Sequence, residues 1–290
     1  MVEMIAAWAK SAELHAPLVD WPQHMAEIMA CLGREDLPRA LDRSLARLVA
    51  FDMTVIFAYP DGAAPLYLHD GFYGHVPGQA LGRYIAGAYL LDPFYTACAR
   101  RVPPGLYRMQ ELAPDAFFAG EYVNSPEVHP CISLESGSLA EEIGFMVPLA
   151  GGFMASYSLM RRNGRPPFMP AEIGLLRHVE PVVRQAIQLH WRDLQAPGAP
   201  LPRPQAAGSA PMGGSGELEA AFQRFANDRL SAREQHIVQM ILRGHSTHSI
   251  ADRLGIAEGT VKNHRKSIYA KLGISSQQEL FARFIRHLFG

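Results

Sequence analysis

The sequence predicts two kinds of fold in one chain: an N-terminal α/β/α sandwich with an antiparallel sheet at residues 1–195, and an all-α domain of four helices at 218–290. Apolar residues alternate with period two in the middle of the first part, and they recur at helical spacing on either side of it and throughout the last part. Residues 196–217 between the two are rich in Pro, Gly, Ala and Ser and keep no apolar period, which is typical of a flexible linker.

Two helices are expected at the start of the first domain. Asp20 precedes Trp21-Pro22, and proline is favoured in the first turn of a helix. This helix should end near Gly33. Asp36 opens the next one, whose leucines share one face: Leu37, Leu41, Leu45 and Leu48.

Strands and helices then alternate along the chain. Two hairpins are expected, one turning at Pro60-Asp61-Gly62 and one at Ala150-Gly151-Gly152. Their strands are Met53–Tyr59, Pro65–His69, Glu142–Leu149 and Phe153–Arg161. Helices are expected at 78–91, 92–101, 114–124 and 170–192. Hairpins with helices before, between and after them give an antiparallel sheet that helices cover on both faces.

The last domain carries clear helix start and stop signals. Ser231 and Glu234 form a capping box, in which the hydroxyl accepts a backbone N–H and the carboxylate returns to the cap. Gly244 ends that helix. Ser246 can cap the second helix, which Gly255 ends.

A short connection links the second and third of these helices. Three residues separate Gly255 from a helix that starts near Gly259, so the two helices must cross steeply, as in a helix-turn-helix. Gly273 ends the third helix. Ser275 with Gln278 predicts a second capping box, ahead of a final amphipathic helix.

The third helix presents polar and basic side chains suited to DNA. A helix fits the major groove, and its N-terminal residues reach the base edges. Lys262, Asn263 and Lys266 are the candidates for base contacts. Thr260, Arg265 and Lys271 are better placed for phosphates, which fix register without reading sequence.

Charge supports this interpretation. The whole chain has a formal net charge of −1, but residues 218–290 hold 11 Lys+Arg and 6 Asp+Glu, whereas residues 1–217 hold 16 and 22. A basic domain is therefore attached to an acidic one, which favours binding to nucleic acid. The alternative is a small helical bundle with an ordinary solvated basic face.

Residues 230–280 resemble the LuxR-type (NarL-type) DNA-binding domain. The matching residues are Leu230, Arg233, Glu234, Gly244, Ile250, Ala251, Leu254, Thr260, Val261, Lys262, His264, Ile268, Lys271, Leu272 and Gly273. Two positions depart from the family. Ser249 stands where a glutamate is usual, and Ala257 stands where a serine caps the recognition helix. The resemblance implies a helix-turn-helix that binds double-stranded DNA as a homodimer.

Residues 20–190 resemble the autoinducer-binding domains that are joined to this DNA-binding domain in quorum-sensing regulators. The resemblance is carried by Tyr84, Asp92-Pro93, Tyr107, Gly144–Pro148, Gly152–Met154 and Ser158. It implies a pocket between sheet and helices. Asp92 would accept the ligand's N–H, Tyr84 and Tyr107 would enclose the ligand, and Ser158 would offer a hydroxyl to a ligand carbonyl.

One departure bears on the ligand. The tryptophan that normally holds a lactone carbonyl should fall near Gln79 or Ala80, and neither is tryptophan. A small organic molecule other than an acyl-homoserine lactone, with an N–H or ammonium group for Asp92, is therefore favoured. Simpler readings stay open: Asp92 as a helix cap only, the tyrosines as core aromatics, and Ser158 facing water.

Other chemistry finds little support. His129, Cys131 and Glu135 lie close in sequence but most simply form a loop, and a lone histidine such as His69, His75 or His178 is weak evidence for haem. Three dispersed cysteines, no signal peptide and no apolar run of about 18 residues favour a cytoplasmic protein. No phosphate-binding loop or zinc spacing occurs, so we expect no cofactor, no metal and no enzyme.

These observations predict a ligand-responsive, DNA-binding transcriptional regulator that binds pseudo-palindromic operators as a dimer. Its partners would be double-stranded DNA, a small-molecule effector and a second copy of the chain, with RNA polymerase a further candidate. The alternative is a regulator of the same type whose N-terminal domain responds to a protein partner.

Overall fold

The computed structural model describes residues 18–60, 64–73, 81–82, 84–85, 88–115, 139–194, 222 and 224–289. Several expectations lie outside these ranges. They are the residues of the first hairpin turn after Pro60, most of the helix at 114–124, the linker at 196–217, the missing tryptophan's position at 79–80, and the cluster of His129, Cys131 and Glu135.

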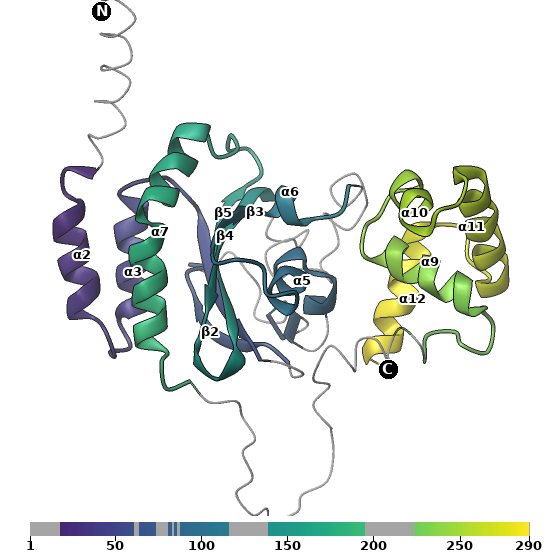
Figure 1. Ribbon diagram of the computed structural model, residues 1–290, viewed down its shortest axis with the longest axis horizontal. Helices are drawn as coiled ribbons and strands as arrows, with labels where there is room; N and C mark the ends of the chain where they lie inside the picture. The colour runs from purple at the N-terminus through teal and green to yellow at the C-terminus, as the bar shows by residue number, and fades with distance from the viewer. Residues whose placement is uncertain are drawn as a thin grey trace, which may run out of the picture.

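A five-stranded antiparallel sheet forms the centre of the N-terminal domain (Figure 1). Its strand order is β2-β1-β5-β4-β3. The bounds are β1 Met53–Tyr59, β2 Leu66–Asp70, β3 Gly105–Arg108, β4 Leu139–Pro148 and β5 Met154–Arg162. The pairing of both predicted hairpins is confirmed. β2 and β5 each lie one residue later than expected, and β4 begins three residues earlier. The antiparallel sheet is therefore predicted correctly.

The sequence missed the edge strand β3 and the short helix α6 (Met109–Leu112). Each has four residues, which is too short to show either the strand or the helix period. β3 is held by pairing with β4, in which Tyr107 lies opposite Gly144. Tertiary pairing, not local propensity, therefore defines this edge.

Three helices cover one face of the sheet: α2 (Trp21–Ala30), α3 (Leu37–Ala46) and α7 (Pro170–His190) (Figure 1). The expected leucine face of α3 is buried, and it packs in one apolar cluster with Ile56, Phe145 and Tyr157 from the sheet. These positions alternate with residues that face the other way. The two faces therefore have separate cores, as in a sandwich.

The opposite face of the sheet is covered by α5 (Pro93–Ala99), preceded by the 3-10 turn η2 (Ala88–Leu91). Phe57 from β1 and Met146 from β4 belong to this second core. Gly144 makes the packing possible, because a Cβ at this position would lie 2.6 Å from the Phe94 ring. This face positions the candidate site in the N-terminal domain.

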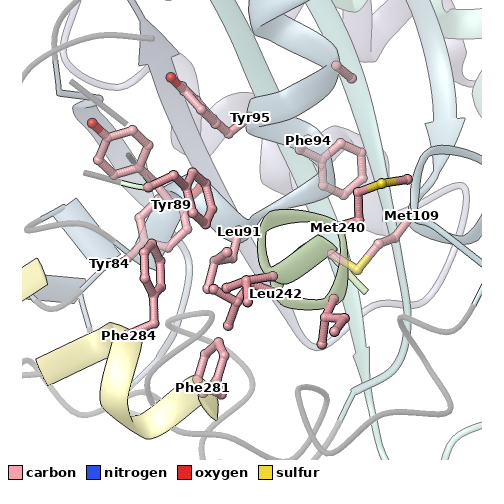
Figure 2. Packing of buried hydrophobic residues seen from close by; sticks show 14 of the residues in the cluster. Tyr84, Tyr89, Leu91, Phe94, Tyr95, Met109, Met240, Leu242, Phe281 and Phe284 are labelled. Atoms are coloured by element: carbon pink, nitrogen blue, oxygen red, sulfur yellow. The ribbon is translucent and has the colours of Figure 1, made fainter. Parts of the chain in front are cut away.

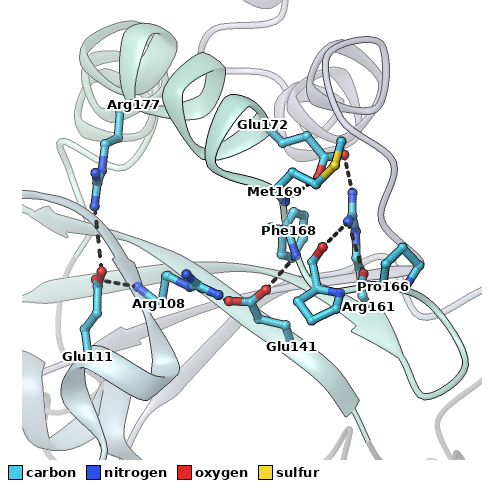
Figure 3. Close-up of polar contacts among 10 residues, drawn as sticks. Arg108, Glu111, Glu141, Arg161, Pro166, Phe168, Met169, Glu172 and Arg177 are labelled. Atoms are coloured by element: carbon cyan, nitrogen blue, oxygen red, sulfur yellow. Dashed lines mark hydrogen bonds and ion pairs between the residues drawn. The ribbon is translucent and has the colours of Figure 1, made fainter.

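Polar contacts fasten the helices of the first face to the sheet (Figure 3). The Arg161 guanidinium binds the Glu172 carboxylate at the start of α7, and the Phe168 N–H donates to Glu141 on β4 over 2.6 Å. On α3 the buried Asp42 accepts from the Tyr157 hydroxyl at 2.6 Å and lies 2.8 Å from His69 Nε2. His69, considered above as a haem ligand, is therefore engaged in a structural contact.

Four main helices form the C-terminal domain: α9 (Ala232–Leu242), α10 (Thr247–Leu254), α11 (Glu258–Leu272) and α12 (Gln277–Phe289) (Figure 1). The caps at Ser231 and Ser246 are confirmed. Gly255 and Gly273 both adopt the left-handed conformation that ends a helix, with φ of 62° and 64°.

The last cap was predicted one residue too early. The N–H of Glu279 donates to the Ser276 hydroxyl, and the Glu279 carboxylate accepts from Ser275. Ser276 is therefore the cap of α12 in place of the expected Ser275, and the side chain of Gln278 lies outside the described residues. When two serines are adjacent, the geometry of the turn decides which of them caps the helix, and the sequence does not reveal that geometry.

The two domains share one buried apolar cluster (Figure 2). Leu91, Phe94 and Met109 from the N-terminal domain belong to the same cluster as Met240 and Leu242 at the end of α9.

Among the residues that the structure describes, no helix is both long and apolar enough to cross a membrane.

Candidate functional sites

Helix α11 exposes the side chains expected to contact bases. Val261, Ile268 and Leu272 are buried against the rest of the domain, and this fixes the rotation of the helix. Lys262, Asn263 and Lys266 are exposed as a consequence. Lys262 and Asn263 therefore lie near the N-terminal end of α11, where residues of a recognition helix reach base edges, and Lys266 follows one turn later.

The three phosphate candidates differ in their surroundings. Thr260 is exposed. The Arg265 guanidinium donates to Thr247 Oγ1 and to the Tyr269 hydroxyl, both at 3.2 Å, so it links its own helix to the first turn of α10. Lys271 Nζ lies 2.7 Å from Glu234 Oε2, which directs its charge into the domain.

The start of α11 has no side-chain cap. Ala257 adopts extended φ and ψ angles of −68° and 146°, as a capping residue does, but it makes no capping hydrogen bond. Glu258 in the first turn supplies negative charge there, which interacts favourably with the positive end of the helix dipole. Its carboxylate also contacts His248, and this hydrogen bond raises the pKa of the imidazole.

A carboxylate of the N-terminal domain reaches the start of α10. Asp115 accepts hydrogen bonds from the backbone N–H of Ser246, at 3.0 Å, and from the Ser246 hydroxyl. The neighbouring His245 is half-buried, and burial together with Arg253 lowers its pKa to about 4. The first helix of the helix-turn-helix is thus in polar contact with the N-terminal domain.

Asp92 lies at the centre of a buried polar network on the α5 face of the sheet. It is 2% exposed. Its Oδ1 accepts from the Phe94 N–H at 2.7 Å, which caps α5, and its Oδ2 accepts from the Tyr84 hydroxyl at 2.5 Å. The Tyr84 hydroxyl in turn lies 2.8 Å from that of Tyr59. Asp92 therefore caps a helix and also anchors a hydroxyl network.

Burial raises the pKa of Asp92 to about 6, although the hydrogen bonds from Tyr84 and the backbone oppose this shift. A carboxyl group with this pKa changes charge near neutral pH, so it responds to groups placed beside it.

Strand register places further site residues in one row. Tyr107 lies opposite Gly144, which in turn lies opposite Ser158. Ser158 is 2% exposed, so the alternative that it faces water is wrong. The Tyr107 hydroxyl donates to the backbone carbonyl of Pro103 at 2.9 Å. The structure thus brings Tyr84, Asp92 and Ser158 to one face, with Tyr107 at its edge.

Sequence reasoning missed three residues on this face: Tyr59, Glu142 and Ser156. Glu142 is buried on β4, and burial raises its pKa well above the ordinary value, as does the nearby charge of Asp92. A hydrogen bond with Ser158 opposes the shift. The period of two counted from Gly144 and Ser158 could have found Glu142 and Ser156. We call the set the Asp92 cluster: Tyr59, Tyr84, Asp92, Glu142, Ser156 and Ser158.

Comparison with known proteins identifies the family. Residues 228–284 match the model for bacterial regulatory proteins of the luxR family. A putative HTH-type transcriptional regulator from the exeN 3' region of Aeromonas salmonicida is 30% identical over 197 residues, which is 68% of this chain and 94% of the relative.

Two solved structures are similar in fold. The LBD domain of VqsR from Pseudomonas aeruginosa has a TM-score of 0.49 and 24% identity, covering 59% of this chain and 96% of that one. Escherichia coli SdiA has a TM-score of 0.43 and 15% identity, covering 92% and 96%. From the family match and the curated relative, we conclude that the chain belongs to the luxR family of bacterial HTH-type transcriptional regulators.

Proposed function

We propose that this regulator senses a small organic molecule in its N-terminal domain and binds pseudo-palindromic operators as a homodimer. The observation that carries the proposal is the Asp92 cluster. Burying carboxyl and hydroxyl groups between a sheet and a helix costs free energy unless they are hydrogen-bonded. A site that keeps several of them together is suited to orient a polar ligand.

On DNA, Lys262, Asn263 and Lys266 are proposed to contact base edges, because all three are exposed on α11 and the first two lie near its N-terminal end. Thr260 and Arg265 are proposed to contact phosphates. Lys271 is the weakest of the phosphate candidates, since Glu234 already binds its ammonium group. One such domain buries little DNA surface, and pairing two of them raises the affinity.

For the ligand, we propose a compound other than an acyl-homoserine lactone, held by Asp92, Tyr84 and Ser158, with Tyr107 at the edge. We also propose that the protein acts in the cytoplasm, where its DNA and RNA polymerase are found. Control by a protein partner in place of a metabolite is the competing function.

A thermal-shift screen of the full chain tests the sensing function. The panel contains acyl-homoserine lactones, amines, amides and amino acids. A ligand that binds the folded state raises the melting temperature, by an amount equivalent to about 2.7 kcal/mol at one hundred times Kd. A compound that stabilises the parent but not Asp92→Ala supports the proposal. If no class of compound stabilises the parent, control by a protein partner is the better account.

A further inference from the structure

The Asp92 cluster holds two carboxyl groups on one face. Asp92 caps α5, which packs on β5 and β1. Phe94 of α5 lies against Gly144 of β4, and Glu142 lies two residues before Gly144 on that strand. Both side chains are 2% exposed. Their charges influence each other, since Asp92 helps to raise the pKa of Glu142. The neighbouring Glu141 points to the other face, where its carboxylate binds Arg108 and the Phe168 N–H.

Aromatic rings gather on the same face of the sheet, and Figure 2 shows Tyr84, Tyr89 and Tyr95 among them. The ring centroid of Tyr84 lies 4.6 Å from that of Phe57 and 6.3 Å from that of Tyr89. The ring of Tyr95 lies 4.8 Å from Tyr89 and 5.5 Å from Tyr59. All five rings are buried on the α5 face. Aromatic faces carry negative potential, so they attract a cation as the two carboxylates do.

We propose that the Asp92 cluster takes a ligand with a protonated amine, and that Glu142 is the residue that makes the site select an ammonium group over a neutral one. The inference rests on the proposed sensing function and names the class of its ligand. An ammonium group has three donors and no acceptor, which suits two carboxylates and a ring of tyrosines. A lactone or ester would bring mainly carbonyl acceptors to the same carboxylates.

The hydroxyl groups of the cluster fit this arrangement. Tyr84 donates to one oxygen of Asp92, and the Phe94 N–H donates to the other, so the carboxylate is fixed in orientation. A second buried carboxyl group on the same face makes the charged state of both groups costly. A cation between them removes that cost, whereas a neutral ligand does not.

The test compares amines with uncharged analogues of the same shape on the full chain. The pairs are phenethylamine with 2-phenylethanol, putrescine with 1,4-butanediol, and n-octylamine with 1-octanol. Binding is followed by thermal shift and by calorimetric titration at pH 7.5. The variant is Glu142→Gln, which keeps shape and removes the charge. Glu27→Gln on the exposed side of α2 is the control with the same change in charge.

The expected result is that at least one amine stabilises the parent and its alcohol does not. Glu142→Gln should weaken that amine at least tenfold, and Glu27→Gln should not. If alcohol and amine bind alike, or if Glu142→Gln weakens both equally, the inference is overturned while the sensing function stands. If no amine binds but a lactone or amide does, the ligand class is wrong. If nothing binds, the proposed function fails with it.

Discussion

Glu234 links two helices of the DNA-binding domain, and its replacement by glutamine tests how that domain is stabilised. Its carboxylate accepts from the backbone N–H of Ser231 at 2.9 Å, from the Ser267 hydroxyl at 2.8 Å and from Lys271 Nζ at 2.7 Å. The side chain is 5% exposed. One carboxylate thus completes the cap of α9 and fastens it to α11.

The expected loss follows from the charge. Burial alone would raise the pKa of Glu234, but hydrogen bonds from Lys271, Ser231 and Ser267 outweigh it, and the pKa falls to about 2. Relative to the ordinary value this corresponds to about 3 kcal/mol of stability at neutral pH. Because the Lys271 side chain is 43% exposed, solvent screens part of this electrostatic stabilisation. We expect Glu234→Gln to cost about 2 kcal/mol.

Hydrogen exchange is the suitable assay. All three tryptophans, Trp8, Trp21 and Trp191, precede the DNA-binding domain in sequence, so tryptophan fluorescence can serve as a control on the N-terminal domain. In Glu234→Gln, amides of α9 that exchange through unfolding of the domain should exchange about 30-fold faster. The exposed Asp252→Asn on α10 serves as the matched variant and should leave the exchange of α9 unchanged. Exchange of α9 that changes less than about threefold would refute the reasoning.

The pH dependence has a definite sign. A carboxyl group whose pKa is lowered by folding stabilises the folded state above its unfolded pKa, and the contribution is lost as the pH falls through the folded value. The stability from Glu234 should therefore be complete above about pH 5 and should disappear towards about pH 2. The parent and Glu234→Gln should converge in stability over that interval.

Three further predictions concern single side chains. Ala257→Ser should stabilise α11 by about 1 kcal/mol, because the backbone at this position already has capping angles. Slower amide exchange in α11 would confirm this stabilisation, and unchanged exchange would contradict it. Asp115→Asn should raise the affinity for DNA in an anisotropy titration. The substitution weakens the carboxylate contact at Ser246, at a helix N-terminus where a DNA phosphate can bind. Equal affinity of variant and parent would contradict this prediction. Gly144→Ala should lower the melting temperature, because overpacking against Phe94 costs about 1–3 kcal/mol, and an unchanged melting curve would rule out that contact.

Local signals explain why most of the DNA-binding domain could be predicted. The caps at Ser231 and Ser246 and the glycines after α10 and α11 act within a few residues, so the sequence contains the whole interaction. The exposed face of α11 follows from the spacing of Val261, Ile268 and Leu272. The cap of α12 was misplaced by one residue because two serines compete for the same role.

The candidate site in the N-terminal domain depends on long-range pairing. Asp92 and Tyr84 are eight residues apart, and their contact could be anticipated from the family resemblance. Glu142 joins them only because β4 lies beneath Phe94 of α5 at Gly144, and these two segments are far apart in the chain. Asp115 and Ser246 are hydrogen-bonded although they are 131 positions apart, and no periodic pattern in the sequence predicts such a contact.

Operator binding by two matched charge-removal variants is the most direct test of the central claim that α11 reads DNA. The full chain first selects a duplex from random sequence. Anisotropy titrations then compare this duplex with a scrambled one for the parent, Lys262→Ala and Arg229→Ala, the last removing an exposed charge near the start of the domain. We predict that Lys262→Ala loses at least tenfold in preference and that Arg229→Ala keeps it. A folded Lys262→Ala protein that retains the full preference would contradict the assignment of α11 as the recognition helix.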